Sequence, residues 1–163
     1  MGHSRNGKTA LLAAAFDERI AMAIPHQAGC GGTAPSRTTV GETIRQINDR
    51  FPHWFNDAFK RYNDRPKALP FDQHALIALM APRPVLLTNA GDDQWANPAG
   101  QFEMLRRAAP AWRLLGAGDF GAEAMPKVNQ FIDTKLGYWI RPGVHSMGPA
   151  DWKVFLDFAD RWL

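Results

Sequence analysis

The sequence predicts an α/β fold in which helices cover both faces of a parallel sheet. Helix-like and strand-like segments alternate along the 163 residues, and the strand-like segments are short apolar runs bounded by turn residues. Continuous apolar runs of this kind are typical of strands that are buried on both faces. With 45% hydrophobic residues and a single cysteine, Cys30, the chain can form one core without an internal disulfide.

The first half of the chain supplies a helix, a strand and a loop. Residues 9–16 are rich in Ala and Leu and contain no Gly or Pro, which predicts a buried helix. Residues 20–25 are a short apolar run, which predicts a buried parallel strand. Residues 27–37 are rich in Gly, Ser, Thr and Pro and predict a loop. The mixed aromatic and charged residues of 41–65 indicate short helices packed over the domain.

The second half continues the same alternation and places loops after the strands. In such folds the active site forms at the carboxyl ends of the strands, so candidate residues are expected there. The expected elements are helices at 72–80, 98–108 and 151–163, strands at 85–89 and 138–141, and a variable loop at about 116–133.

The charge pattern indicates neither a nucleic-acid partner nor a membrane partner. The formal net charge is +3, and no run of five or six like charges forms a basic tail. No apolar run approaches the roughly 20 residues that a membrane-spanning helix needs. The amino terminus also lacks the basic and apolar regions of a signal peptide.

A serine lies in a glycine-bounded motif at the start of the chain. The stretch Gly2-His3-Ser4-Arg5-Asn6-Gly7 resembles the nucleophile elbow of α/β-hydrolases, with the second glycine one place late. Small residues are needed there because the serine sits on a tight turn from strand to helix. We therefore predict Ser4 as a nucleophile, with the backbone N–H of Arg5 directed at the oxyanion.

Two further residues complete a triad in the expected order. Asp93 follows the predicted strand 85–89, and His145 follows the predicted strand 138–141. The chain order Ser, Asp, His is that of α/β-hydrolases. We predict His145 as the base and Asp93 as the acid, with the neighbouring Asp92 as the second choice for the acid.

Longer motifs resemble one family, the glucuronoyl esterases of carbohydrate esterase family fifteen, and its bacterial members in particular. The resemblance runs along the whole chain and corresponds to about the second half of a typical member. The matching motifs are Ser4-Arg5-Asn6-Gly7-Lys8, Phe16-Asp17-Glu18-Arg19-Ile20, Phe51-Pro52-His53-Trp54-Phe55, Leu69-Pro70-Phe71-Asp72-Gln73-His74, Ala81-Pro82-Arg83-Pro84-Val85, Asp93-Gln94-Trp95-Ala96-Asn97-Pro98 and Asp151-Trp152.

The resemblance implies cleavage of (4-O-methyl-)glucuronic acid esters, including those that join xylan side chains to lignin alcohols, with no metal or organic cofactor. It implies that Arg5 also stabilises the oxyanion through its guanidinium. It further implies that Lys8, Glu42 and Trp95 hold the sugar hydroxyls, which their donors and acceptors can satisfy. Without the resemblance, we would interpret Lys8 as a solvated side chain, Glu42 as a charge at the start of a helix and Trp95 as a residue of the hydrophobic core.

The sequence departs from the family at two places. Many members carry a catalytic glutamate where this chain has Gln27, whose amide cannot supply a charge, so the acid role falls to Asp93. We group Gln27 with the predicted substrate-binding residues. The motif also follows Met1 directly, so we expect the strand that carries Ser4, and everything before it, to be missing. Residues 1–163 are then the C-terminal part of a single α/β-hydrolase catalytic domain, truncated before the elbow. The segment 20–25 is expected to be a bare sheet edge, and the chain alone to be unstable or inactive.

Two other functions remain open on the sequence. One is a different carbohydrate esterase on the same fold, such as an acetyl-xylan esterase. The other is a non-catalytic fragment that retains only sugar binding. Because related enzymes act on plant cell walls, we expect a secreted or periplasmic parent protein; the sequence predicts no oligomeric state.

Overall fold

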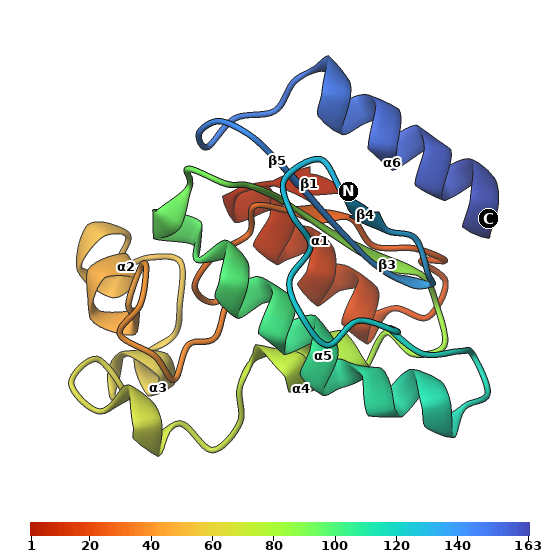
Figure 1. The fold of residues 1–163 in the computed structure, drawn as a ribbon. Coiled ribbons are helices and arrows are strands. Elements are labelled where there is room, and N and C mark those ends of the chain that lie inside the picture. Colours follow the sequence, from red (N-terminus) through yellow and green to blue (C-terminus); the bar gives the residue numbers. More distant parts are fainter.

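The computed structural model describes all residues from Met1 to Leu163 and contains one five-stranded sheet in the order β1-β2-β3-β5-β4 (Figure 1). Neighbouring strands are parallel except at the end of the sheet, where β4 runs antiparallel to β5. The predicted parallel sheet is therefore confirmed, with one antiparallel addition. The strands are β1 (Gly2–His3), β2 (Pro25–His26), β3 (Val85–Ala90), β4 (Phe131–Ile132) and β5 (Leu136–Arg141).

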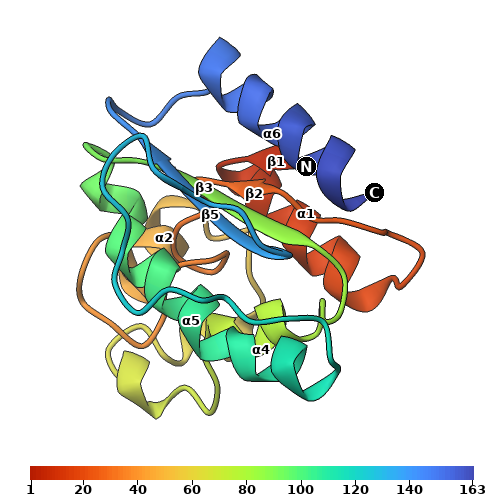
Figure 2. The same ribbon diagram turned by 45° about the vertical axis from the view of Figure 1, so that its right-hand side comes forward.

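Helices cover both faces of this sheet, as the sequence predicted. Figures 1 and 2 show α6 on one face and the group α1, α4 and α5 on the other. The long helices are α1 (Arg5–Phe16), α5 (Pro98–Leu114) and α6 (Pro149–Trp162), and the shorter ones are α2 (Ile44–Arg50), α3 (Asp57–Lys60), α4 (Gln73–Ala78) and the 3₁₀ turns η1 (Pro66–Ala68) and η2 (Gln94–Ala96). No helix is both long enough and apolar enough to cross a membrane.

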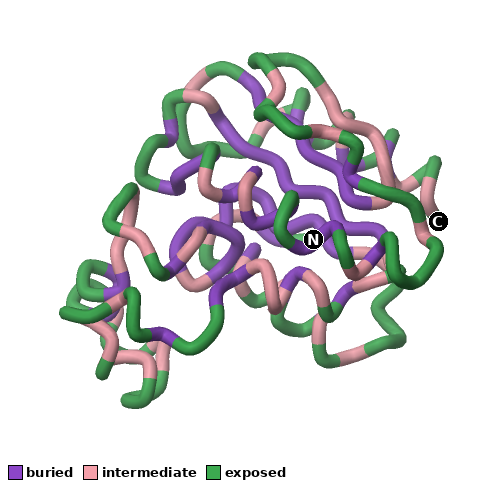
Figure 3. Tube along the Cα trace, turned by 60° about the horizontal axis from the view of Figure 1, so that its bottom comes forward, coloured by how far each residue is buried: buried purple, intermediate pink, exposed green.

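The central strand β3 is packed on both faces, which explains why its sequence is apolar without alternation. Val85 and Leu87 belong to the core formed with α1, α4 and α5, whereas Leu86 packs with Phe155 and Phe158 of α6. Successive side chains of a strand point to opposite faces, so burial on both faces demands apolar residues throughout. Figure 3 shows the buried segments gathered along the strands.

The expectation that the strand carrying Ser4 is missing is wrong. Gly2 and His3 form β1, which pairs in parallel with β2, and the hydrogen bonds Gly2 N to Ile24 O (3.2 Å) and Ser4 N to His26 O (2.9 Å) fix it there. The predicted strand 20–25 is formed only at its end, since β2 comprises Pro25 and His26. Ile24 and Pro25 pair with Gly2, so this end of the segment is not a bare edge, because β2 lies between β1 and β3. The outermost parallel strand is β1 instead.

Several element boundaries also differ from the prediction. Helix α1 begins at Arg5 rather than at residue 9; its first turn consists of polar residues and Gly7, which have no apolar pattern. Helix α5 continues through Pro110 to Leu114, where the packing of Trp112 in the core outweighs the hydrogen bond that the proline removes. The predicted variable loop 116–133 contains β4, a strand that only its pairing with β5 defines.

Residues 41–65 contain the short helices α2 and α3, as their sequence predicted. Helix α2 begins with a capping box in which Thr43 and Gln46 bond each other's backbone N–H groups. Its Ile44 and Ile47 are fully buried and pack with Cys30 and Leu69. This small second core holds α2 and α3 beside the loop that follows β2.

Candidate active site

Ser4 occupies a strained turn between β1 and α1. Its φ of 58° and ψ of −122° lie in a region that residues with side chains rarely adopt. A Cβ on Gly2 would lie 2.1 Å from Asn6 O, and one on Gly7 would lie 2.9 Å from Gly2 O. The turn therefore requires glycine at both positions, and the late second glycine serves the close approach of α1 to β1.

Asp93 and His145 form the closest pairing between the predicted site residues. His145 Nδ1 donates to Asp93 Oδ2 across 2.6 Å, and the other carboxylate oxygen accepts from Ala96 N at 3.2 Å. This bond directs Nδ1–H at the carboxylate and leaves Nε2 as the acceptor. Asp92 is exposed and instead accepts from Gly143 N at 3.2 Å. Of the two candidates for the acid, only Asp93 reaches the imidazole.

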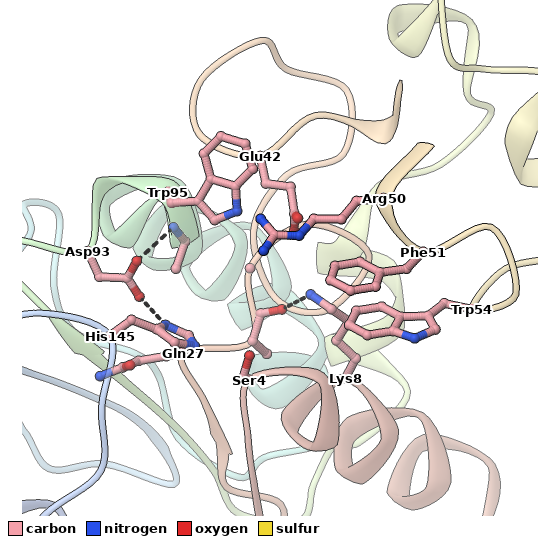
Figure 4. A pocket seen from close by; sticks show the side chains of 13 residues that line it. Ser4, Lys8, Gln27, Glu42, Arg50, Phe51, Trp54, Asp93, Trp95 and His145 are labelled. Atoms are coloured by element: carbon pink, nitrogen blue, oxygen red, sulfur yellow. Dashed lines mark hydrogen bonds and ion pairs between the residues drawn. The ribbon is translucent and has the colours of Figure 1, made fainter. Parts of the chain in front are cut away.

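A cavity of about 320 Å³ brings most of the predicted site residues together (Figure 4). In the figure the ring of His145 lies between the carboxylate of Asp93 and the hydroxyl of Ser4. Ser4 and His145 line the same cavity, but no hydrogen bond joins them in the structure. The predicted residues that line it are Ser4, Lys8, Gln27, Glu42, Asp93, Trp95 and His145.

Lys8 and Glu42 give the cavity two partly buried groups of opposite charge. Lys8 Nζ donates to the carbonyl oxygens of Ala28 and of Cys30 (2.7 Å), which leaves one of its three donors for a ligand. Burial lowers the pKa of Lys8, and the nearby Glu42 opposes that shift. Burial likewise raises the pKa of Glu42, against the charge of Lys8 and a hydrogen bond from the Trp95 side chain.

Trp95 is held beside Glu42 by the backbone. Glu42 N donates to Trp95 O at 2.9 Å, and a Cβ on Gly41 would lie only 2.7 Å from the same oxygen. The indole is half exposed, at 49%, and faces the cavity with Glu42 (Figure 4). A tryptophan of the core would be buried, so this side chain does not serve the core.

Gln27 and Arg5 make contacts that the sequence did not predict. Gln27 lines the cavity, but its Oε1 accepts from Ser146 N at 3.0 Å, so its side chain holds the loop of His145. Arg5 is exposed and lines a second, larger groove beside α1 rather than the cavity of Ser4. Arg5 is the first residue of α1 and follows Ser4, so its backbone position agrees with a role at the oxyanion, whereas its side chain does not line the cavity.

His3 is a neighbour of His145 that sequence reasoning missed. Its ring centroid lies 4.6 Å from that of His145 and 4.9 Å from that of His26. Burial, followed by the proximity of His26 and His145, lowers the pKa of His3 to about 4. The only sequence signal for His3 was its place in the elbow motif, between Gly2 and Ser4. At this place it ends β1, and its side chain lies near His26 and His145.

Aromatic residues form a further wall of the cavity. Phe51 and Trp54 stack with ring centroids 3.9 Å apart and planes within 4° of parallel, and both line the cavity together with Arg50. The sequence predicted no site role for Phe51, Trp54 or Arg50. No group of three or more His, Cys, Asp and Glu side chains is placed so as to hold a metal ion.

Comparisons with known sequences place the chain in a family. The model for fungal glucuronyl esterases matches residues 1–116. A carbohydrate esterase from an unknown prokaryotic organism is 49% identical over 163 residues, which are 100% of this chain and 38% of that protein. A 4-O-methyl-glucuronoyl methylesterase of Phanerochaete carnosa is 35% identical over 125 residues, or 72% of this chain and 31% of that protein.

Solved structures agree with this assignment. A promiscuous esterase of carbohydrate esterase family fifteen from a marine bacterial metagenome superposes with a TM-score of 0.97 at 48% identity, over 99% of this chain and 41% of that one. The glucuronoyl esterase of Solibacter usitatus gives 0.92 at 42% identity, over 98% of this chain and 41% of that one. The chain thus spans about two fifths of these solved relatives. It belongs to the glucuronoyl esterase family.

Proposed function

We propose that this chain carries the catalytic centre of a serine-type carboxylic ester hydrolase that cleaves (4-O-methyl-)glucuronoyl esters. The observation that supports the proposal most directly is the 2.6 Å hydrogen bond between His145 and Asp93 at a cavity that also exposes Ser4. A carboxylate, an imidazole and a hydroxyl in this succession are what nucleophilic attack by serine requires.

In the proposed first step, His145 Nε2 takes the proton of Ser4 as Oγ attacks the ester carbonyl carbon. Asp93 holds the ring in the required tautomer and stabilises its positive charge. The negative charge of the tetrahedral intermediate forms beside the first turn of α1, where the backbone N–H groups of Arg5 and Asn6 have no partner. As the carbon–oxygen bond to the alcohol breaks, His145 returns the proton to the departing alcohol.

The proposed second step frees the enzyme. His145 removes a proton from a water molecule, and the resulting hydroxide attacks the carbonyl carbon of the acyl-serine. The bond to Ser4 Oγ then breaks, His145 protonates Oγ, and the uronic acid leaves and releases its remaining proton to water. Both steps use the same three side chains and require no redox partner.

We assign the sugar to the part of the cavity between Lys8, Glu42 and Trp95. An ammonium, a carboxylate and an indole N–H provide both donors and acceptors for ring hydroxyls. The curated relatives named 4-O-methyl-glucuronoyl methylesterases support a methylated glucuronate as the ring concerned. By extension, the proposed natural substrates are the esters that join glucuronoyl side chains of xylan to lignin alcohols.

The proposal is tested with the purified 163-residue chain on two readouts. Hydrolysis of benzyl glucuronate measures turnover, and covalent labelling with a fluorophosphonate, located by mass spectrometry, measures the nucleophilicity of Ser4. Because β1 pairs with β2 and holds Ser4 in place, we expect both to be present, in contrast to the sequence-based prediction that the chain alone is inactive. Both should disappear in Ser4→Ala. Turnover that survives Ser4→Ala, or the absence of both turnover and labelling in the unaltered chain, would contradict the proposal.

A comparison of substrates tests the specificity separately. Lys8, Glu42 and Trp95 are expected to favour a methyl glucuronate ester over acetylated xylan in kcat/KM. A preference for acetylated xylan would support a different carbohydrate esterase. Sugar binding that persists in Ser4→Ala without hydrolysis by the unaltered chain would support a non-catalytic sugar-binding protein.

We also propose that the parent protein acts outside the cytoplasm, because its proposed polymeric substrate cannot enter a cell. Cell fractionation with an antibody against this chain tests the proposal. A protein recovered only from the cytoplasm would contradict it.

A further inference from the structure

Arg141 bonds the backbone on both sides of His145. It is the last residue of β5, and its guanidinium Nη2 donates to Ser146 O at 2.7 Å and to Val144 O at 3.3 Å. The same nitrogen donates to Ser146 Oγ at 2.8 Å, and Nη1 donates to Pro142 O at 2.8 Å. One planar side chain thus connects three carbonyl oxygens of the loop that carries the imidazole.

The guanidinium is itself fixed by a buried carboxylate. Arg141 Nε lies 3.0 Å and 3.1 Å from the two oxygens of Asp151, whose side chain is 1% exposed. Asp151 also accepts from Gly148 N at 2.8 Å, which joins the pair to the start of α6. A buried ion pair is weak support for stability, because desolvation offsets its attraction. The N–H donors of the Arg141 guanidinium, however, hold the geometry of the loop.

Two residues at the carboxyl end of β2 also bond the same loop. His26 Nε2 lies 2.9 Å from Ser146 O, and Gln27 Oε1 accepts from Ser146 N at 3.0 Å. The loop needs such support because Val144 and His145 are largely exposed and belong to no helix or strand. Arg141 supplies the largest share of it, with four bonds to residues 142, 144 and 146.

We propose that Arg141 is a positioning residue for His145, and that it sets where the imidazole lies between Asp93 and Ser4. Arg141 touches neither the substrate nor the reacting atoms and acts only through the loop 142–146. Its effect on turnover rests on the proposed function, whereas its effect on the bond between His145 and Asp93 does not. A displacement of about 1 Å at a reacting group can cost about 100-fold in rate.

The test compares two variants of Arg141 with a control in the core. Arg141→Gln cannot span Asp151 and the loop together, whereas Arg141→Lys retains the charge and a donor. Phe158→Leu removes buried volume beneath α6 and has no contact with the loop, so it reports destabilisation alone. The readouts are kcat and KM on benzyl glucuronate, and the Nδ1-bound proton of His145 in spectra of the protein labelled with ¹⁵N-histidine.

We expect Arg141→Gln to lower kcat about 100-fold at nearly constant KM, with loss or a large shift of the His145 proton signal. Arg141→Lys should recover part of both, and Phe158→Leu should lower Tm while leaving both readouts unchanged. An unchanged His145 signal in both Arg141 variants would overturn the proposal. If Arg141→Gln does not fold, Arg141→Lys tests the proposal on the same readouts: a lowered kcat with a shifted His145 signal supports it, and an unchanged His145 signal overturns it. If the unaltered chain shows no turnover, the proposed function fails, while the His145 signal still tests Arg141.

Discussion

The carboxylate of Asp93 is hydrogen-bonded to His145 Nδ1 at 2.6 Å although 52 positions separate the two residues. Asp93 is buried after β3, and His145 follows β5 in an exposed loop. Because β3 and β5 are adjacent and parallel, their carboxyl ends bring the two loops together. The pair thus depends on the strand order as much as on the residues.

Asp93→Asn is expected to lower kcat about 10⁴-fold, because the amide can stabilise the wrong tautomer of His145 and cannot stabilise its charged form. Steady-state kinetics on benzyl glucuronate measure the effect. Asp92→Asn is the matched control, since the Asp92 carboxylate accepts only from Gly143 N, and this variant should leave kcat near that of the unaltered chain. Equal losses in the two variants would exclude Asp93 as the particular partner of the base.

Glu42→Gln is expected to remove a pH dependence from KM. Burial raises the pKa of Glu42, so its carboxylate becomes protonated at a higher pH than an ordinary glutamate does. The charged acceptor for a sugar hydroxyl is therefore lost as the pH falls, and KM should rise. A glutamine carries no titrating group, so KM should be higher but flat. The measurement is KM against pH from about 4 to 7; a wild-type KM that does not change over this range contradicts the assignment.

His3→Phe is expected to make the fold less sensitive to acid. The pKa of His3 is lowered from 6.5 to about 4 in the folded chain, so between these pH values the unfolded chain binds a proton that the folded chain does not. Stability is full above the higher value and falls as the pH drops towards the lower one. Phenylalanine retains a ring against His145 without titrating. Tm measured by circular dichroism across this window should therefore fall less steeply in the variant.

The exposed His53 provides the control for this measurement. His53→Phe changes the same residue type at a position outside the stack of imidazoles and should keep the wild-type pH dependence of Tm. If His3→Phe shows that dependence unchanged as well, the burial of His3 does not contribute to acid sensitivity.

Gly2→Ala is expected to destabilise the chain by about 2–3 kcal/mol, because its Cβ would lie 2.1 Å from Asn6 O and force β1 away from α1. Gly148→Ala is the control, since a Cβ there meets nothing within 4 Å. Urea unfolding followed by tryptophan fluorescence compares the two. A Gly2→Ala variant as stable as Gly148→Ala would show that the turn at Ser4 does not need this glycine.

The sequence by itself determined the elements whose signals are local. The apolar run of β3 and the alanine-rich helix α1 were predicted because burial on both faces, or on one stripe, leaves a readable pattern. The order Ser4, Asp93, His145 was also readable, since Ser4 lies in an elbow motif and Asp93 and His145 each follow a predicted strand. That residues 1–163 are the C-terminal part of a single catalytic domain stays a prediction.

Only the tertiary structure decided the features that depend on pairing between distant segments. β1 and β4 are two residues long and have no pattern of their own, so hydrogen bonds to β2 and β5 alone define them. The choice of Asp93 over Asp92, and the contact of Arg141 with the loop of His145, likewise depend on directions of side chains. A sequence pattern reports whether a residue is buried or exposed, whereas the partner of a polar atom is set by which strands lie side by side.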